Sequence, residues 1–188
     1  DVPRTLKWID VDLPGILDYK VDLLKNEKPV CAYDAVRLDL TDAARRRALF
    51  SQVGSESKRV LVVTEGLLIY LTADQVGTLA GDLHAPPSFH SWLIDLANPR
   101  LLQIMQRYWG KNVQAGNAPF QFAPAEGTAF FEKFGWRERE FRSSQAEAQR
   151  LKREMSMMWL WRFLSNLHSA KVREEFRRMS GMVVLERK

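Results

Sequence analysis

The sequence has little cysteine and histidine and lacks a long apolar run. Cys31 is the only cysteine, so no intramolecular disulfide can form, which fits a reducing cytoplasm. The three histidines, His84, His90 and His168, are scattered and offer no metal-ligand spacing. No apolar run approaches the length of a membrane span. These absences predict a cytoplasmic protein with no metal centre and no membrane contact.

Glycine-rich phosphate loops are missing as well. Neither the GxGxxG nor the GxxxxGK[ST] pattern occurs in the chain. Cofactors with several phosphates, such as NAD or ATP, would therefore lack their usual binding loop. Binding of a cofactor that contains adenosine but no phosphate is compatible with this absence.

Composition is that of an ordinary globular protein. The 188 residues, 46% hydrophobic and 27% charged, predict a single domain over residues 1–188 with a sizeable core. The net charge is +5, and basic residues gather late in the chain, but acidic residues alternate with them at the spacing of exposed helix faces. We therefore expect solvated helices there and no nucleic-acid partner.

Strand and helix patterns alternate along most of the chain. Strands are expected at residues 5–12, 30–36, 60–63, 89–96, 136–141 and 181–186. Helical spacing between the early strands predicts βαβ crossovers, and hence an α/β fold with a mostly parallel sheet and helices on both faces. The inward helix faces are expected at Leu17, Val21 and Leu24; Ala44, Ala48 and Leu49; and Val76, Leu79, Ala80 and Leu83.

Two later segments have alternative interpretations. Residues 110–125 lose regular patterning, and a loop of that length is typical of a lid or a substrate wall. Residues 157–167 form a very apolar helical stretch with methionine and tryptophan. This stretch is either core or a wall that faces a substrate or a second subunit.

Three acidic residues follow three successive predicted strands. Residues 60–63 read as a fully buried strand, which breaks at Glu65 and Gly66. Asp12 and Asp39 lie in the same position after the first two strands. Each could simply cap a helix or end a strand in solvent. The carboxyl ends of parallel strands meet at one edge, however, so the three together predict a ligand crevice.

Three sequence blocks resemble the leucine carboxyl methyltransferase family, which includes many bacterial S-adenosylmethionine-dependent methyltransferases. The most distinctive block resembles that family's EGLL-x-YL signature, and the spacing between the blocks also fits. The blocks are Trp8-Ile9-Asp10-Val11-Asp12-Leu13-Pro14 with Lys20, Val36-Arg37-Leu38-Asp39-Leu40, and Thr64-Glu65-Gly66-Leu67-Leu68-Ile69-Tyr70-Leu71. The resemblance extends to residues 95–100.

This resemblance implies a class I, Rossmann-like methyltransferase with S-adenosyl-L-methionine as cofactor. Residue by residue, it implies that Asp12 holds the ribose, that Asp39 and Leu40 bracket the adenine, and that Glu65 lies where the methionine end meets the acceptor. The implied acceptor-side residues are Tyr70, Asp95, Asn98 and Arg100. The resemblance assigns no catalytic residue.

The chain departs from the family at its beginning. The family's first strand and its glycine-rich loop should precede residue 1, so we expect an N-terminally truncated chain with open strand edges. The expected function is O-methylation of a small-molecule or carboxylate acceptor. The alternative is a non-catalytic fragment that acts as a binding or dimerisation module. The expected partner is a small-molecule substrate. Whether the protein also forms a homodimer is left open.

Overall fold

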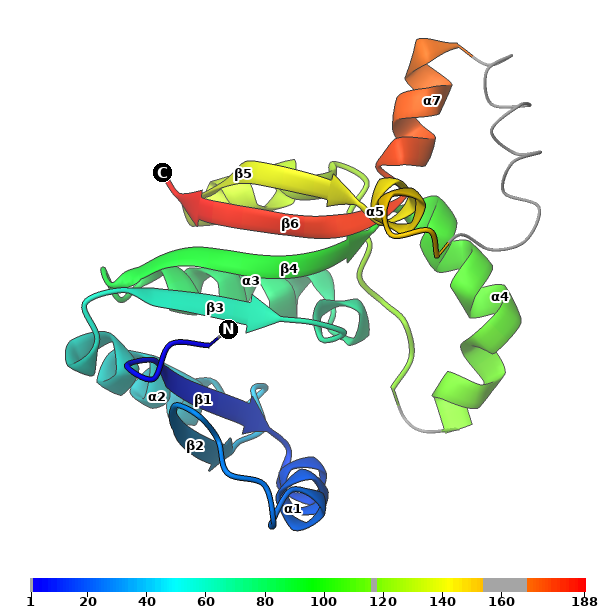
Figure 1. Cartoon of the computed structure of the whole chain (residues 1–188). Coiled ribbons are helices and arrows are strands. Elements are labelled where there is room, and N and C mark those ends of the chain that lie inside the picture. The colour runs from blue at the N-terminus through cyan, green and yellow to red at the C-terminus, as the bar shows by residue number, and fades with distance from the viewer. Residues whose placement is uncertain (1, 116–117, 154–168) are drawn as a thin grey trace. The chain divides into compact units, whose positions relative to one another are not determined.

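The computed structural model describes residues 2–115, 118–153 and 169–188. The chain divides into two compact units, one that ends at Val53 and one that begins at Gly54 (Figure 1). We describe each unit by itself. The predicted apolar stretch at residues 157–167 lies outside the described residues.

The first unit is built on a two-stranded parallel sheet. Strands β1 and β2 run in register from the Lys7–Ala32 pair to the Asp12–Arg37 pair. Pro14 begins α1, where a missing backbone N–H costs no hydrogen bond. Asp42 begins α2, since its carboxylate accepts hydrogen bonds from the amides of Ala44 and Arg45. The elements are β1 (Lys7–Asp12), α1 (Pro14–Leu23), β2 (Ala32–Arg37) and α2 (Ala43–Glu56).

The second unit contains a four-stranded sheet in the order β3-β4-β6-β5 (Figure 1). Only β3 and β4 are parallel, whereas β6 is antiparallel to both β4 and β5. The elements are β3 (Val60–Thr64), η1 (Leu68–Tyr70), α3 (Ala73–His84), β4 (Phe89–Ala97), α4 (Pro99–Ala115), η2 (Gly127–Phe134), β5 (Trp136–Ser143), α5 (Ser144–Arg150), α7 (Ala170–Arg177) and β6 (Ser180–Arg187).

The α/β fold class is confirmed, but the expectation of a mostly parallel sheet is wrong for the second unit. Two of its three strand pairings are antiparallel. The cause is the C-terminal pair of strands, in which β6 inserts between β4 and β5. A return of this kind needs no helical crossover, so the strand-helix alternation of the earlier residues does not extend to it.

Aromatic side chains fill the core of the second unit. Trp92 lies edge-on to both Phe131 and Trp136, with ring centroids 5.4 and 5.7 Å apart, and all three are fully buried. The indole N–H of Trp136 donates to the carbonyl of Ala80 on α3 over 3.0 Å. The predicted inward face of α3 is confirmed, and its four residues are buried: Val76, Leu79, Ala80 and Leu83.

Strand β3 is less buried than its apolar sequence predicts. Its side chains alternate, and Leu61 and Val63 are 60% and 42% exposed. Thr64 is buried on the other face, where its hydroxyl accepts a hydrogen bond from the indole of Trp92 over 3.0 Å. The prediction of full burial is wrong, because a short apolar run does not reveal whether one face of a strand or both are covered.

Helix positions depart from the sequence predictions in three places. Helix α4 continues to Ala115, so the irregular segment predicted from residue 110 starts too early. Isolated Gly110 only weakens a helix and does not end it. Ala44 and Ala48 are exposed on α2, where Arg46 and Phe50 are buried instead. On α1 only Leu17 is buried, whereas Val21 and Leu24 are exposed.

Strands β1 and β3 belong to different sheets, and among the described residues each pairs with one strand only. Each therefore has one edge of unpaired backbone groups. Such edges are expected from the sequence where the family's first strand would lie. No helix in the described part of the chain is long and apolar enough to cross a membrane.

Candidate functional site

Two of the predicted acidic residues lie at the same end of the first unit's sheet. Asp12 ends β1, and its backbone carbonyl accepts a hydrogen bond from the amide of Leu38 over 2.9 Å. Asp39 is the next residue after Leu38. One carboxylate oxygen of Asp12 accepts from the amide of Leu13 over 2.7 Å, and the side chain is exposed. Parallel pairing thus brings both acids to one edge, as predicted.

Asp10 organises the strand that carries Asp12. One of its carboxylate oxygens accepts from the indole of Trp8 over 2.8 Å. The other accepts from the ammonium of Lys20 over 2.5 Å and the hydroxyl of Tyr33 over 2.7 Å. Partial burial raises the pKa of Asp10, but these three hydrogen bonds outweigh it and hold the pKa below its usual value. The network ties α1 and β2 to β1.

Asp39 is held in its charged form by a turn. One of its carboxylate oxygens accepts hydrogen bonds from the Thr41 hydroxyl over 2.7 Å and from the Thr41 amide over 2.8 Å. The hydroxyl bond is the larger cause that lowers the pKa of Asp39, and the amide bond adds to it. The second carboxylate oxygen faces no donor among the described residues. Leu40 next to it is half-buried and offers an apolar edge.

Glu65 lies in the second unit, after β3. Gly66 follows in the left-handed conformation, with φ of 63°, and turns the chain sharply. The Gly66 amide donates to the carboxylate of Asp95 over 2.9 Å, so Asp95 on β4 fixes this turn. The Glu65 carboxylate is exposed and has no hydrogen-bond or ion-pair partner among the described residues. It is free to receive a polar ligand group.

Tyr70 lies against an extended segment that follows α4. Its ring is 5.6 Å from the ring of Phe120, and its carbonyl accepts from the side chain of Gln121 over 2.8 Å. The amides of Gln121 and Phe122 both donate to the carbonyl of Ile69. In the segment predicted as a lid or a substrate wall, residues 110–115 belong to α4 and residues 121–122 are anchored to η1. The role as a lid or a wall stays a prediction.

Asn98 and Arg100 have structural partners. The Asn98 side chain accepts from the amide of Leu101 over 2.9 Å and so caps α4. The guanidinium of Arg100 lies 4.8 Å from the ring centroid of Phe176. That stacking partner lies far along the chain, and no local pattern predicts it. A role for either residue in binding an acceptor stays a prediction.

A cavity of about 380 Å³ lies at the carboxyl end of β4, beside Asn98. Its walls come from four segments: the end of β4, the turn before η2, β5 and α7. No sequence pattern predicts this cavity and its charged residues, because the four segments meet only in the folded chain. The one local signal is the spacing of Glu174, Glu175 and Arg178, which alone does not distinguish a cavity wall from an exposed helix.

The predicted site residues therefore form two groups. Asp12, Asp39 and Leu40 belong to the first unit, and Glu65, Tyr70, Asp95, Asn98 and Arg100 belong to the second. Within each group the residues lie at carboxyl ends of strands or just beyond them. In the described parts of the chain, no group of three or more His, Cys, Asp or Glu residues could hold a metal ion.

Comparisons with known proteins give one family match and several similar folds. The family model of leucine carboxyl methyltransferase matches residues 1–83. That match covers Asp12, Asp39, Leu40, Glu65 and Tyr70. No curated protein matches the sequence.

Several solved structures share the fold at low sequence identity. An O-methyltransferase family protein from Burkholderia thailandensis has a TM-score of 0.58 at 14% identity, over 97% of this chain and 44% of its own. A putative O-methyltransferase from Nostoc punctiforme has a TM-score of 0.55 at 9% identity, over 96% of this chain and 45% of its own.

A third similar structure is an O-methyltransferase family 2 protein from Planctomyces limnophilus, in complex with apigenin. Its TM-score is 0.54 at 10% identity, over 97% of this chain and 43% of its own. The chain thus spans less than half the length of each of these three proteins. Residues 1–83 match the leucine carboxyl methyltransferase family, and the chain has the fold of the class I methyltransferases.

Proposed function

We propose that the protein acts in S-adenosyl-L-methionine-dependent methyl transfer to an oxygen of a small molecule, either a carboxylate or an acidic hydroxyl. The observation that carries this proposal is the pair of carboxylates at the ends of β1 and β2, within the segment that matches the family model. The fold of O-methyltransferases supports the same reaction class.

The residues in the first unit suit the adenosine part of this cofactor. The second carboxylate oxygen of Asp12 is free of the Leu13 amide and suits the hydroxyls of a ribose. The second oxygen of Asp39 suits an exocyclic amine, and Leu40 would contact the adenine ring. Bound there, S-adenosylmethionine supplies an electrophilic methyl group on a sulfonium.

The chain's own contribution is orientation. In an in-line displacement of this kind, a protein mainly positions the reactants and excludes water. Glu65 has no partner in the described part of the chain and lies next to a turn fixed by Asp95, and it would orient groups where the methionine end meets the acceptor. A carboxylate acceptor needs no general base. His84, at the end of α3, and His90, at the start of β4, both lie away from the carboxyl ends of the strands.

A methyl-transfer assay tests the proposal. The full-length protein is incubated with cofactor labelled in the methyl group and with a mixture of small carboxylic acids and phenols. We expect labelled product that is lost in Asp12→Asn and kept in Asp22→Asn. Asp22 is an exposed residue of α1 whose carboxylate pairs with Lys25 over 3.0 Å. Bound cofactor without any transfer to a broad acceptor mixture would contradict the proposed reaction.

A further inference from the structure

The cavity beside Asn98 lies on the same edge of the sheet as Glu65. Strands β3 and β4 are parallel, so Glu65 after β3 and Asn98 after β4 both follow carboxyl ends. Strand β6 begins there as well, because Ser180 pairs with Ala97. The cavity is therefore at the end of the second unit where the resemblance puts the acceptor.

The cavity has an apolar wall. Leu96, Pro124 and Phe141 contribute to its lining. Phe141 reaches this side through a bulge in β5, where the pairing with β6 shifts between Glu138 and Glu140. The extra residue moves Phe141 to the face that also carries Glu138. This wall suits an aromatic or branched apolar group.

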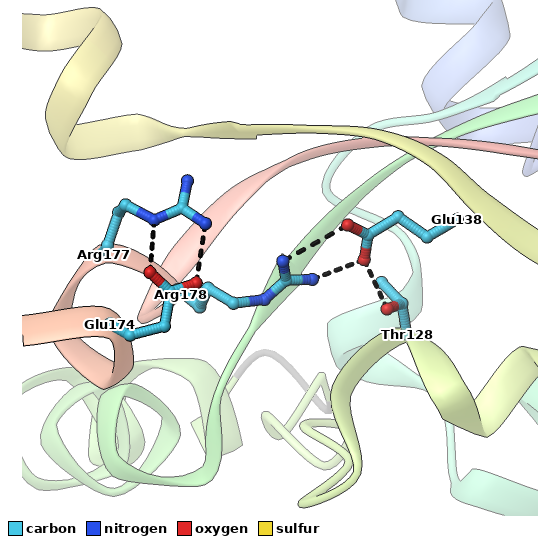
Figure 2. A network of polar contacts seen from close by, with 5 residues as sticks. All are labelled: Thr128, Glu138, Glu174, Arg177 and Arg178. Carbon is cyan, nitrogen blue, oxygen red and sulfur yellow. Dashed lines mark hydrogen bonds and ion pairs between the residues drawn. The ribbon is translucent and has the colours of Figure 1, made fainter. Parts of the chain in front are cut away.

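The one arginine in the lining is already neutralised. Both terminal nitrogens of Arg178 donate to the carboxylate of Glu138, one of them over 3.2 Å (Figure 2). The Thr128 hydroxyl donates to the same carboxylate over 2.5 Å. The guanidinium also lies 4.3 Å from the ring centroid of Phe141. Arg178 is thus already paired with a carboxylate, which reduces its attraction for an anionic ligand.

Glu138 stays charged in this arrangement. Burial raises its pKa, but the hydrogen bonds from Arg178 and Thr128 outweigh burial and lower the pKa below its usual value. On α7, Glu174 is engaged in a second fork, in which Arg177 donates to its two oxygens over 2.7 and 2.6 Å (Figure 2). Within each of these two pairs, the positive charge of the arginine neutralises the negative charge of the glutamate.

Two carboxylates of the lining are left uncompensated. Neither the side chain of Glu126, in the turn before η2, nor that of Glu175, on α7, has a hydrogen-bond or ion-pair partner among the described residues. Among the described residues, the lining therefore combines an apolar wall with a net negative charge. These side chains would repel a carboxylate group of a ligand and would attract an ammonium group.

We propose that this cavity binds an amine that carries an aromatic ring on a short alkyl chain, with the ring against Phe141 and the ammonium group near Glu126 and Glu175, and that the methyl acceptor carries such a group. The second clause rests on the proposed function. The proposal that the cavity binds an amine does not depend on the proposed function. It rests on two carboxylates of the lining that lack partners among the described residues, and on the pairing of Arg178 with Glu138. Recognition of the acceptor then depends on its positive charge, and methylation occurs at a separate oxygen of the same molecule.

The test uses three probes of one shape and different charge, without any cofactor. Phenethylamine is the cation, phenethyl alcohol the neutral form and hydrocinnamate the anion. Calorimetric titration of the full-length protein should give the tightest binding for the amine and the weakest for hydrocinnamate. In the double variant Glu126→Gln and Glu175→Gln, amine binding should weaken about fivefold, since exposed ion pairs contribute modestly. Binding of the alcohol should not change.

Glu132→Gln is the matched control. Glu132 is an exposed acid whose carboxylate pairs with Lys188 over 3.0 Å and takes no part in the cavity. This variant should bind all three probes like the original protein. Equal binding of amine and alcohol, or an unchanged amine affinity in the double variant, overturns the inference. Loss of amine preference with cofactor binding intact contradicts the inference alone. Absent cofactor binding with the preference intact contradicts the proposed function alone.

Discussion

The backbone amide of Gly66 donates a hydrogen bond to the carboxylate of Asp95 over 2.9 Å. This bond joins the ends of two parallel strands, because Gly66 follows β3 and Asp95 lies near the end of β4. It holds the turn that presents Glu65. Asp95 therefore has a structural role, and its place on the acceptor side stays a prediction.

Replacement of Asp95 should loosen this turn. Asp95→Ala removes the acceptor and should lower the free energy of unfolding by about 1–2 kcal/mol, since the amide of Gly66 then loses its partner. Asp95→Asn keeps an oxygen acceptor and should cost clearly less. Thermal unfolding of both variants measures the difference. Equal losses would show that the charge of Asp95, rather than this hydrogen bond, stabilises the turn.

Two glycines should respond differently to alanine. Gly66 has φ of 63°, and an added Cβ would meet no atom within 4 Å, so Gly66→Ala should cost only the conformational term of about 1 kcal/mol. Gly135 has φ of 86°, and its added Cβ would come within 2.5 Å of His84 Nε2. Gly135→Ala should cost roughly 3 kcal/mol.

Denaturant unfolding of the two glycine variants tests this order. Gly66→Asn is the control, because asparagine adopts the left-handed region more readily than alanine and should be tolerated better. A Gly66→Ala variant that is as unstable as Gly135→Ala would contradict the account.

The capping box at the start of α3 should behave as one unit. The Thr72 hydroxyl accepts from the amide of Gln75 over 3.2 Å, and the Gln75 side chain accepts from the amide of Thr72 over 2.8 Å. Thr72→Ala should cost about 1 kcal/mol of unfolding free energy. The double variant with Gln75→Ala should cost less than the sum of the single variants, because the two bonds support each other. Strict additivity would argue against coupling.

Stability should fall on mild acidification because of His84. Burial lowers the pKa of His84, the charge of Arg187 lowers it further, and a backbone hydrogen bond with Gly135 only partly opposes these effects. Its Nε2 is buried without a partner. The unfolded chain, with a histidine pKa of about 6.5, therefore takes up a proton before the folded chain does. The contribution of neutral His84 to the free energy of unfolding is complete above about pH 6.5. It is lost as the pH falls towards the lowered pKa of His84 in the folded chain.

Unfolding free energies measured from pH 7.5 down to pH 5 would reveal this dependence. His84→Gln should flatten the decline, whereas His90→Gln, at an exposed position of β4, should leave it unchanged. An identical pH profile in His84→Gln would assign the decline to other groups.

Local patterns predict much of this fold. The inward face of α3 follows from the spacing of its apolar residues, and Gly135 ends η2 as expected of a glycine after a helical segment. The pattern fails on α2, where the arginine-rich face buries Arg46, whose guanidinium donates to the carbonyl of Leu40 over 2.5 Å. A buried hydrogen-bonded arginine cannot be recognised from hydrophobic spacing alone.

The candidate site likewise contains some residues that sequence patterns predict and others that they do not. Asp12, Asp39 and Glu65 could be predicted because strand ends and a distinctive motif mark them. The partners of Arg100, Glu138 and Arg178 depend on contacts between segments far apart in the chain, so no periodic pattern contains them. The absence of a nucleic-acid partner and the homodimer both stay predictions. Described arginines of the late basic region, Arg150 and Arg177, pair with Glu147 and Glu174.

Calorimetric titration of the full-length protein with S-adenosylhomocysteine tests whether Asp12 and Asp39 hold the adenosine part of the cofactor. We expect saturable binding that weakens at least tenfold in Asp12→Asn and in Asp39→Asn, since each replacement removes a charged acceptor. Binding should be unchanged in Asp22→Asn. No binding at millimolar ligand, or equal binding by all four proteins, would contradict the assignment of Asp12 and Asp39 to this cofactor.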